Sequence, residues 1–233
     1  MHMNKTDIFT TAWESYRTMV QCDYLWHSMV MDSLDKMLAR FTKPIRFLDL
    51  ACGDAEQTTN LLQAKSIGHY VGVDRSGPAL AIAAENVKRL STPVELVTAD
   101  FVEFLEGTDK RFEVIYVGLS AHHLGEASLP RFFAAVRRCL APSGVFAAYE
   151  PFLLPDEVRL DYADRFSIIA NRLWVEMTIE QRARVNAHVR EFDFPLKLTQ
   201  WNDLARVAGL SNASTLMKTP DRISMLVSHV AAS

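Results

Sequence analysis

Hydrophobic and polar positions along the chain follow two alternating patterns. Short apolar runs, typical of buried strands, are separated by segments in which apolar residues recur every three or four positions, as in helices. The predicted strands cover residues 46–50, 69–73, 94–98, 112–117 and 144–149. The predicted helices between them lie at about 56–65, 78–90 and 129–140. This alternation predicts an α/β fold with a mostly parallel sheet and helices on both faces.

Three segments depart from the alternation. Apolar residues at helical spacing over 7–41 predict two helices that end before Pro44. A similar stripe, followed by Thr178 with Gln181 three residues on, predicts an inserted helical pair at about 155–198. The chain then closes with a helix from Thr199 and two strands, at 213–217 and 223–230.

These patterns suggest a division of the chain into two parts. Residues 1–44 would form an N-terminal helical cap, and residues 45–233 a Rossmann-like domain. The insertion at 155–198 would be a lid on that domain, and the cap could close the same crevice.

Composition and charge exclude some classes of function. The 233 residues are 49% hydrophobic and carry a net charge of −3, without a run of Lys or Arg that could follow a phosphate backbone. We therefore expect no nucleic-acid partner. Three widely spaced cysteines suit reduced thiols. Neither a signal peptide nor a membrane-length apolar run is evident, so we expect a cytoplasmic protein with no membrane partner.

The first candidate for chemistry is the stretch from Arg46 to Thr58. A strand ends at Asp49 and Leu50, a turn of small residues follows at Ala51 and Gly53, and a helix begins at about residue 56. Small residues let backbone amides approach a ligand, and open α/β sheets bind ligands at the carboxyl ends of their strands. The alternative is an ordinary strand–helix turn that binds nothing.

Polar residues also follow the other strands. Asp74 ends the second strand and could accept hydrogen bonds from ribose hydroxyls, or could simply cap a helix. Asp100 and Phe101 follow the third strand and could hold an adenine, or be a turn acid beside a core ring. The fourth strand ends in Gly118-Leu-Ser-Ala-His-His-Leu124, and the fifth in Glu150.

Taken in order, these motifs resemble the class I S-adenosylmethionine-dependent methyltransferases over about residues 46–150. The resemblance rests on five short sequences: Leu48-Asp-Leu-Ala-Cys-Gly53, Val71-Gly-Val-Asp74, Ala99-Asp-Phe101, His122-His-Leu124 and Leu140-Ala-Pro-Ser-Gly-Val145. It implies a seven-stranded sheet whose last strand runs antiparallel. It also implies S-adenosylmethionine as cofactor and S-adenosylhomocysteine as product.

The resemblance also implies roles for individual residues. Asp49, Ala51 and Gly53 would line the methionine end of the cofactor, with the backbone of Gly118 and Leu119 facing the sulfonium. Asp74 would hold the ribose, Asp100 and Phe101 would hold the adenine, and Arg75 is expected at the same site.

The sequence departs from the family pattern in three places. The usual Gly-x-Gly-x-Gly reads Ala51-x-Gly53-x-Ala55, which puts the cofactor affinity in question. The Asn-Pro-Pro-Tyr-like motif of nucleic-acid methyltransferases is missing after the fourth strand, and no pair of acids for a divalent metal is evident. His122 and His123 are adjacent and have no cysteine cluster beside them, so we expect no metal site.

Methyl transfer needs a general base only if the acceptor must lose a proton. His123 is the first candidate and His122 the second, because their loop faces the reaction end; Glu150 could orient an acceptor amine. The alternative for each is a packing or capping role. Predicted substrate contacts are the aromatic and polar-tipped side chains of the cap, the lid and the fifth strand: Tyr16, His27, Tyr149, Tyr162 and Trp174.

The predicted function is methyl transfer from S-adenosylmethionine to an O or N atom of a small molecule, such as a secondary metabolite. Two alternatives remain open. The first is an enzyme that uses the bound sulfonium without transferring its methyl group, and the second is a non-catalytic binding module. A dehydrogenase is less favoured, because the full Gly-x-Gly-x-x-Gly turn is absent. The first helices could also form a homodimer contact.

Overall fold

The structure is a computed structural model that describes residues 15–231. The start of the predicted N-terminal helix, before residue 15, lies outside the described residues. Residues 15–21 are helical, and a second helix, α2 (His27–Leu38), follows. Among the described helices, none combines the length and the apolar character needed to cross a lipid bilayer.

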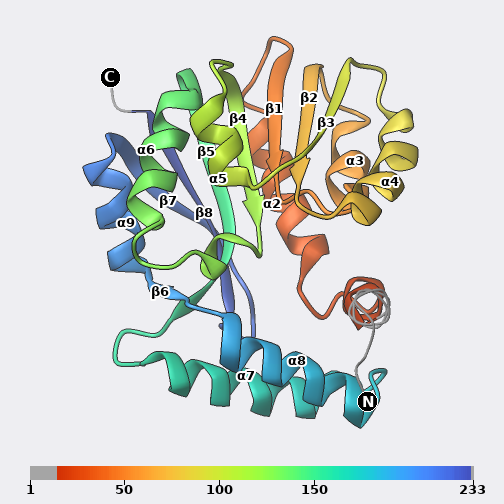
Figure 1. Cartoon of the computed structure of the whole chain (residues 1–233), viewed down its shortest axis with the longest axis vertical. Coiled ribbons are helices and arrows are strands. Elements are labelled where there is room, and N and C mark those ends of the chain that lie inside the picture. The colour runs from red at the N-terminus through yellow and green to blue at the C-terminus, as the bar shows by residue number, and fades with distance from the viewer. Residues whose placement is uncertain (1–14, 232–233) are drawn as a thin grey trace.

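A single mixed sheet organises the molecule (Figure 1). Its strands run in the order β3-β2-β1-β4-β5-β8-β7, and neighbours among the first five are parallel. β8 is antiparallel to both of its neighbours, as expected for the last strand. The strands are β1 (Ile45–Leu50), β2 (Ile67–Asp74), β3 (Val94–Thr98), β4 (Phe112–Gly118), β5 (Leu140–Leu153), β7 (Leu210–Lys218) and β8 (Ser224–Ala231).

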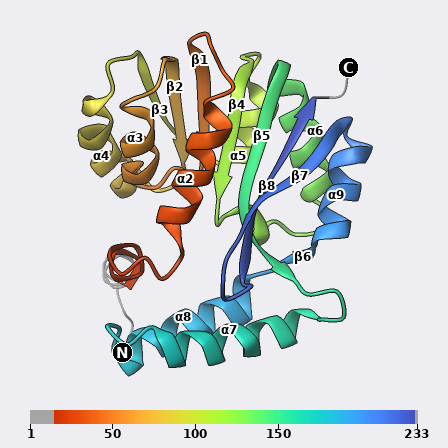
Figure 2. The same cartoon turned by 180° about the vertical axis from the view of Figure 1, so that it is seen from behind.

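Helices cover both faces of the sheet, as the alternating pattern predicts. On one face, α5, α6 and α9 pack over a core that contains Phe132, Phe146 and Trp201. On the other face, α2, α3 and α4 pack over a core that contains Leu34 and Tyr70 (Figure 2). These helices are α3 (Glu56–Leu62), α4 (Gly77–Asn86), α5 (Phe101–Gly107), α6 (Leu129–Cys139) and α9 (Leu198–Val207), with short 3₁₀ turns η1 (Val87–Arg89) and η2 (Ala121–His123).

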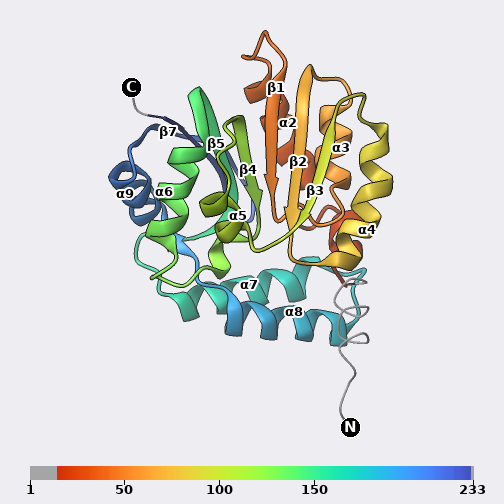
Figure 3. The ribbon, with the colours of Figure 1, turned by 45° about the horizontal axis from the view of Figure 1, so that its top comes forward.

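The insertion after β5 forms a separate layer. Its helices α7 (Arg159–Leu173) and α8 (Ile179–Phe192) lie side by side across the end of the sheet where β1, β2 and β4 finish (Figure 3). They enclose a core of their own, built around Phe166 and Trp174. We refer to α7 and α8 as the lid.

Two elements differ from the sequence predictions. The sheet has eight strands instead of seven, because β5 extends beyond Glu150 and its far end pairs with the two-residue strand β6 (Leu196–Lys197). Helix α5 was not predicted. Its seven residues are too few for a helical period to emerge, and Asp100 caps it through bonds to the amides of Val102 and Glu103.

Candidate active site

A pocket of about 280 Å³ opens at the carboxyl ends of β1, β2 and β4. This is the end of a parallel sheet at which α/β folds bind their ligands. The pocket brings together nine of the residues predicted from the sequence. They are Asp49, Ala51, Gly53, Asp74, Gly118 and Leu119 from the predicted cofactor set, and Tyr16, His27 and Tyr149 from the predicted substrate set.

Asp49 is the most buried acid of this pocket, with 2% of its surface exposed. Its Oδ2 accepts hydrogen bonds from the Thr58 hydroxyl at 2.6 Å and from the Tyr70 hydroxyl at 2.8 Å. Burial raises the pKa of Asp49 from its ordinary 3.8 to about 6, although the two hydrogen bonds oppose this shift. The motif located Asp49, but no pattern in the sequence marked Thr58 or Tyr70 as its partners.

The turn after β1 has an unusual backbone. Ala51, Gly53 and Ala55 all have φ between 53° and 56°, in the left-handed region that favours glycine. A side chain built on Gly53 would meet nothing within 4 Å, so this part of the turn is open to the pocket. The two alanines therefore occupy glycine-type positions at a cost in conformational energy.

Asp74 holds the same turn from the neighbouring strand. Its Oδ2 accepts a hydrogen bond from the backbone amide of Gly53 at 2.9 Å, and its Oδ1 accepts one from the amide of Ser76 at 2.7 Å. A carboxylate can accept about four hydrogen bonds, so each oxygen keeps capacity for a ligand. Asp74 thus lies where a ribose contact is expected and also fixes the shape of the turn.

The pocket is strongly acidic. Four carboxylates line it, those of Asp49, Asp54, Glu56 and Asp74, and its lining residues within the described chain include no Lys or Arg. The nearby phenol of Tyr16 responds to this environment: burial, together with Asp54 and Asp49, raises its pKa. Such a pocket favours a cationic ligand over an anionic one.

His27 lies at the same pocket, at the start of α2. It is 8% exposed, and its Nδ1 finds no hydrogen-bond partner among residues 15–231. Burial lowers its pKa, against an opposing effect of Asp23, so the imidazole is neutral near pH 7. A buried, unpaired ring nitrogen beside a pocket is available to a bound molecule.

The residues predicted to hold the adenine do not line this pocket. Phe101 is buried in the core, with its ring 5.6 Å from that of Phe132. This position gives no support to packing of the Phe101 ring against an adenine. It agrees with the alternative, in which Phe101 is a core side chain beside a turn acid. Asp100 caps α5, and Arg75 is 79% exposed with its guanidinium 4.0 Å from Asp100.

Glu150 and His122 form a buried pair beside the pocket but do not line it. Glu150 Oε2 lies 2.6 Å from His122 Nδ1, and Glu150 Oε1 accepts hydrogen bonds from the amides of Ser120 and Ala121. Glu150 therefore holds the loop whose residues Gly118 to Ser120 line the pocket. Burial by itself lowers the pKa of His122, but contacts with Asp193 and Glu150 outweigh it and raise the value to about 9.

His123 faces the lid instead of the pocket. Its Nδ1 lies 3.0 Å from the carbonyl oxygen of Phe192, and its ring packs edge-on against that of His188 at 5.4 Å. Asp193, at the end of α8, approaches the same group of rings. Sequence reasoning missed both His188 and Asp193, because lid residues have no motif that ties them to the loop after β4.

Tyr162 and Trp174 belong to the core of the lid. Both are at most 4% exposed, and Trp174 stacks on Tyr24 at 5.4 Å. Neither residue lines the pocket. Both side chains therefore pack inside the lid and do not face the pocket, which is the packing role expected as the alternative to a substrate contact.

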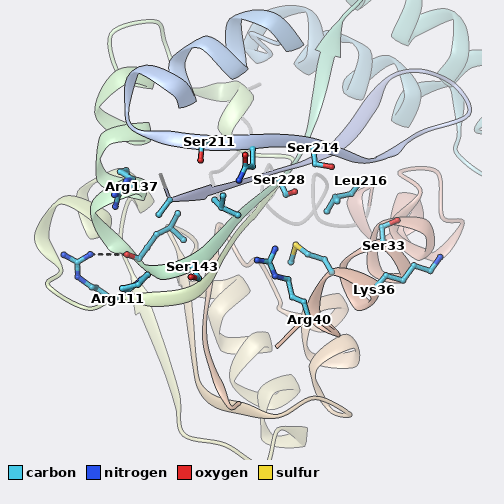
Figure 4. A pocket seen from close by; sticks show the side chains of 16 residues that line it. Ser33, Lys36, Arg40, Arg111, Arg137, Ser143, Ser211, Ser214, Leu216 and Ser228 are labelled. Carbon is cyan, nitrogen blue, oxygen red and sulfur yellow. Dashed lines mark hydrogen bonds between the residues drawn. The ribbon is translucent and has the colours of Figure 1, made fainter. Parts of the chain in front are cut away.

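A larger groove lies away from the strand ends just described (Figure 4). Its volume is about 1330 Å³, and its lining includes the basic side chains of Lys36, Arg40, Arg111 and Arg137. Arg111 donates a hydrogen bond to the Leu140 carbonyl oxygen at 3.1 Å. None of the predicted site residues lines this groove. The smaller pocket is therefore the candidate active site.

Comparison with known proteins relates this chain to methyltransferases. Residues 47–144 match the model of a methyltransferase domain family. Trans-aconitate 2-methyltransferase from Acidovorax sp. (strain JS42) is 34% identical over 119 residues, which make up 50% of this chain and 43% of that protein. The match thus spans less than half the length of this curated relative.

Solved structures share the fold at lower identity. The CurJ carbon methyltransferase superposes with a TM-score of 0.62 and 18% identity, over 89% of this chain and 54% of that one. The PH0226 protein from Pyrococcus horikoshii OT3 superposes with a TM-score of 0.58 and 22% identity, over 88% and 90% of the two chains.

The matched segment, residues 47–144, contains the ends of β1, β2 and β4 that shape the pocket. The expected mostly parallel sheet with an antiparallel last strand, the turn after β1 and the acid at the end of β2 are all present in the structure. Residues 47–144 therefore match a methyltransferase domain, and the chain resembles the class I S-adenosylmethionine-dependent methyltransferases, whose cofactor is S-adenosylmethionine and whose product is S-adenosylhomocysteine.

Proposed function

We propose that this protein transfers a methyl group from S-adenosylmethionine to an oxygen or nitrogen atom of a small molecule, such as a secondary metabolite. The observation that carries the proposal is the acid-lined pocket at the strand ends, with His27 at its side and no hydrogen-bond partner for His27 Nδ1 among residues 15–231. S-adenosylmethionine supplies a methyl group on a sulfonium, a good leaving group, so the protein mainly has to align the acceptor and exclude water.

The chemistry of the pocket fits this cofactor. S-adenosylmethionine carries two cationic groups, the sulfonium and the amino group, and the pocket offers four carboxylates. The same lining disfavours a dinucleotide such as NAD, because its pyrophosphate is anionic and no Lys or Arg among the described lining residues would pair with it. Asp49 is proposed to hold the methionine end of the cofactor and Asp74 its ribose.

We assign the proton acceptor, where one is needed, to His27. Support comes from its neutral imidazole beside the pocket and from its Nδ1, which has no hydrogen-bond partner within the described part of the chain. His123 is a weaker candidate than the sequence indicated, since its Nδ1 is bonded to the Phe192 carbonyl away from the pocket. Glu150 is better described as a positioning residue, because it binds the backbone of the loop that lines the pocket.

The charge of the pocket also bears on the acceptor. The curated relative is named for trans-aconitate, a polycarboxylic acid. An acceptor with several carboxylates would be repelled by Asp49, Asp54, Glu56 and Asp74. Arg17 lies beside Asp54 and Glu56 in an adjoining pocket but is not part of this lining, so one cation faces four acids. We therefore favour a neutral or cationic acceptor, such as a phenol or an amine.

The first experiment is a thermal-shift titration with S-adenosylmethionine, S-adenosylhomocysteine and NAD. A ligand at about one hundred times its dissociation constant stabilises the folded state by about 2.7 kcal/mol, enough to raise the melting temperature measurably. We expect a shift with the two sulfur compounds and none with NAD. A shift with NAD alone would contradict the proposal.

The second experiment measures transfer of the labelled methyl group from S-adenosylmethionine to panels of phenols, amines and carboxylates. The His27→Ala variant is expected to lose about 100-fold or more in turnover of an acceptor that must lose a proton. His69→Ala changes a histidine of β2 that does not line the pocket, and serves as the matched control. Cofactor binding without transfer to any panel would instead favour non-methyl-transfer chemistry or a non-catalytic module.

A further inference from the structure

Three histidines and one aspartate meet where the lid touches the loop after β4. His122 and His123 belong to η2, His188 lies on α8, and Asp193 follows the last residue of α8. One potential metal-binding atom from each of His122, His123 and Asp193 lies within 4.8 Å of the other two. This group is separate from the pocket described above, because none of its four residues lines that pocket.

The ring nitrogens converge on a single oxygen atom. Asp193 Oδ1 lies 3.6 Å from His122 Nε2, 3.6 Å from His123 Nδ1 and 3.9 Å from His188 Nε2. These distances are too long for hydrogen bonds. They exceed by about 0.2–0.5 Å the separation of about 3.4 Å between neighbouring ligands of a tetrahedral zinc ion, which follows from metal–ligand distances of about 2.0–2.1 Å. The histidine nitrogens, His188 Nε2 most of all, would therefore move slightly toward Asp193 on binding an ion.

We propose that His122, His123, His188 and Asp193 bind a divalent transition-metal ion of the zinc type, which fastens the lid to the loop after β4. Three imidazoles and one carboxylate form a donor set suited to Zn²⁺ and to similar ions such as Co²⁺. The proposal goes beyond methyl transfer and does not depend on it.

Glu150 orients the ring of His122 for binding a metal ion. Its Oε2 lies 2.6 Å from His122 Nδ1, and His122 Nε2 faces Asp193, so an ion that displaces the Nε2 proton would leave the remaining proton on Nδ1, directed at Glu150. Metal-binding histidines commonly direct their other nitrogen to a carboxylate in this way, which fixes the tautomer and the ring orientation.

Asp193 provides the second independent observation. Its side chain is 6% exposed, and within residues 15–231 no donor forms a hydrogen bond with its Oδ1. The three histidine nitrogens approach this oxygen only at 3.6–3.9 Å, and a bound cation would give it a direct partner.

The backbone around Asp193 is already fixed in place. The Phe194 amide donates to the His122 carbonyl oxygen at 2.8 Å, and Arg159 Nε donates to the Asp193 carbonyl oxygen at 2.6 Å. The end of the lid and the loop after β4 are thus held together before any ion binds. Such preorganisation lowers the cost of assembling a metal site from separate segments.

Two of the histidines leave one side of the site accessible. The side chains of His123 and His188 are 39% and 56% exposed, so an ion can enter from solvent. His123 must give up its contact with the Phe192 carbonyl oxygen for Nδ1 to bind the ion. The site therefore needs only a small rearrangement, at its exposed edge.

The test uses the whole chain without a polyhistidine tag, freed of metal with a chelator and then titrated with Zn²⁺ and with Co²⁺. We expect one ion per chain at micromolar metal and, for Co²⁺, the visible absorption bands of tetrahedral coordination. His188→Ala and Asp193→Asn should each weaken metal binding by at least about tenfold. The loss of a ligand should weaken binding more than the loss of a residue that only hydrogen-bonds a ligand. Circular dichroism of the metal-free variants checks that they are folded.

His69→Ala is the matched control, because His69 Nε2 lies 4.0 Å from a single carboxylate, that of Glu95, without a second histidine ligand. It should leave metal binding unchanged. The absence of binding in the wild-type chain would refute the proposal and leave the cluster as an ion-pair network. Binding that survives both site variants would also refute it, since the ion would then be elsewhere. Cofactor binding is measured separately, so failure of the metal site and failure of the methyl-transfer proposal can be told apart.

Discussion

Replacing Asp49 with asparagine should make the folded protein more stable while weakening its active site. Thr58 and Tyr70 both donate to the same oxygen of Asp49, Oδ2. An asparagine can place its amide oxygen there and accept both bonds, while the buried charge is removed. The variant therefore isolates the cost of keeping a carboxylate at this position.

The magnitude follows from the shifted pKa. The folded protein raises the pKa of Asp49 from 3.8 to about 6, and this difference corresponds to about 3 kcal/mol. The folded-state value lies above the unfolded one, so the stabilising contribution is complete below about pH 3.8 and is lost as the pH rises through about 6. Asp49→Asn should therefore raise the free energy of unfolding by up to about 3 kcal/mol near pH 7.5.

Urea denaturation of the wild type and the variant, near pH 5 and near pH 7.5, measures this effect. The stability difference between the two proteins should grow by about 1–1.5 kcal/mol over that pH interval. Asp203→Asn, at an exposed acid on α9, should show no such growth. A difference that does not change with pH, or a variant less stable than the wild type at both pH values, would refute the reasoning. Calorimetry should show weaker S-adenosylmethionine binding to Asp49→Asn.

Three further predictions concern the same pocket. Ala55→Gly should raise the free energy of unfolding by about 0.5–1 kcal/mol in urea denaturation, because φ at Ala55 is 53°, a value that glycine adopts without strain. As the control, Ala134→Gly on the exposed side of α6 should lower it by about 1 kcal/mol. Tyr70→Phe should lower the free energy of unfolding by about 1.5–3 kcal/mol near pH 7.5, and by less near pH 5, because it removes a hydrogen bond to the ionised Asp49. Asp74→Ala should weaken cofactor binding by about 1.5–3 kcal/mol in calorimetry, and unchanged affinity would contradict the ribose placement.

Most of the sheet could be predicted from the sequence because each strand is a short apolar run with a polar residue or a turn at its end. The bounds of β3, Val94–Thr98, match the prediction, and β1 and β4 differ from it by one residue at one end. Helix α5 and the extension of β5 could not be predicted. A seven-residue helix shows too little of the helical period, and the far end of β5 is defined by its pairing with Leu196 and Lys197.

For the site, the sequence by itself determined the residues at the strand ends. In a parallel sheet these ends share one edge, so Asp49, Asp74 and Gly118 had to come close together once the strands were identified. Their chemistry, two acids and a position without a side chain, is a property of the residues themselves.

Only the tertiary structure decided what surrounds them. Tyr70 reaches Asp49 from the neighbouring strand. Asp193 approaches His122, and His188 approaches His123, from a segment more than sixty residues further along the chain. The adjacency of His122 and His123 in the sequence gave no sign of the side chains that lie near them in the fold. Contacts between segments remote in sequence depend on how whole layers pack, and no local pattern of apolar and polar residues encodes them.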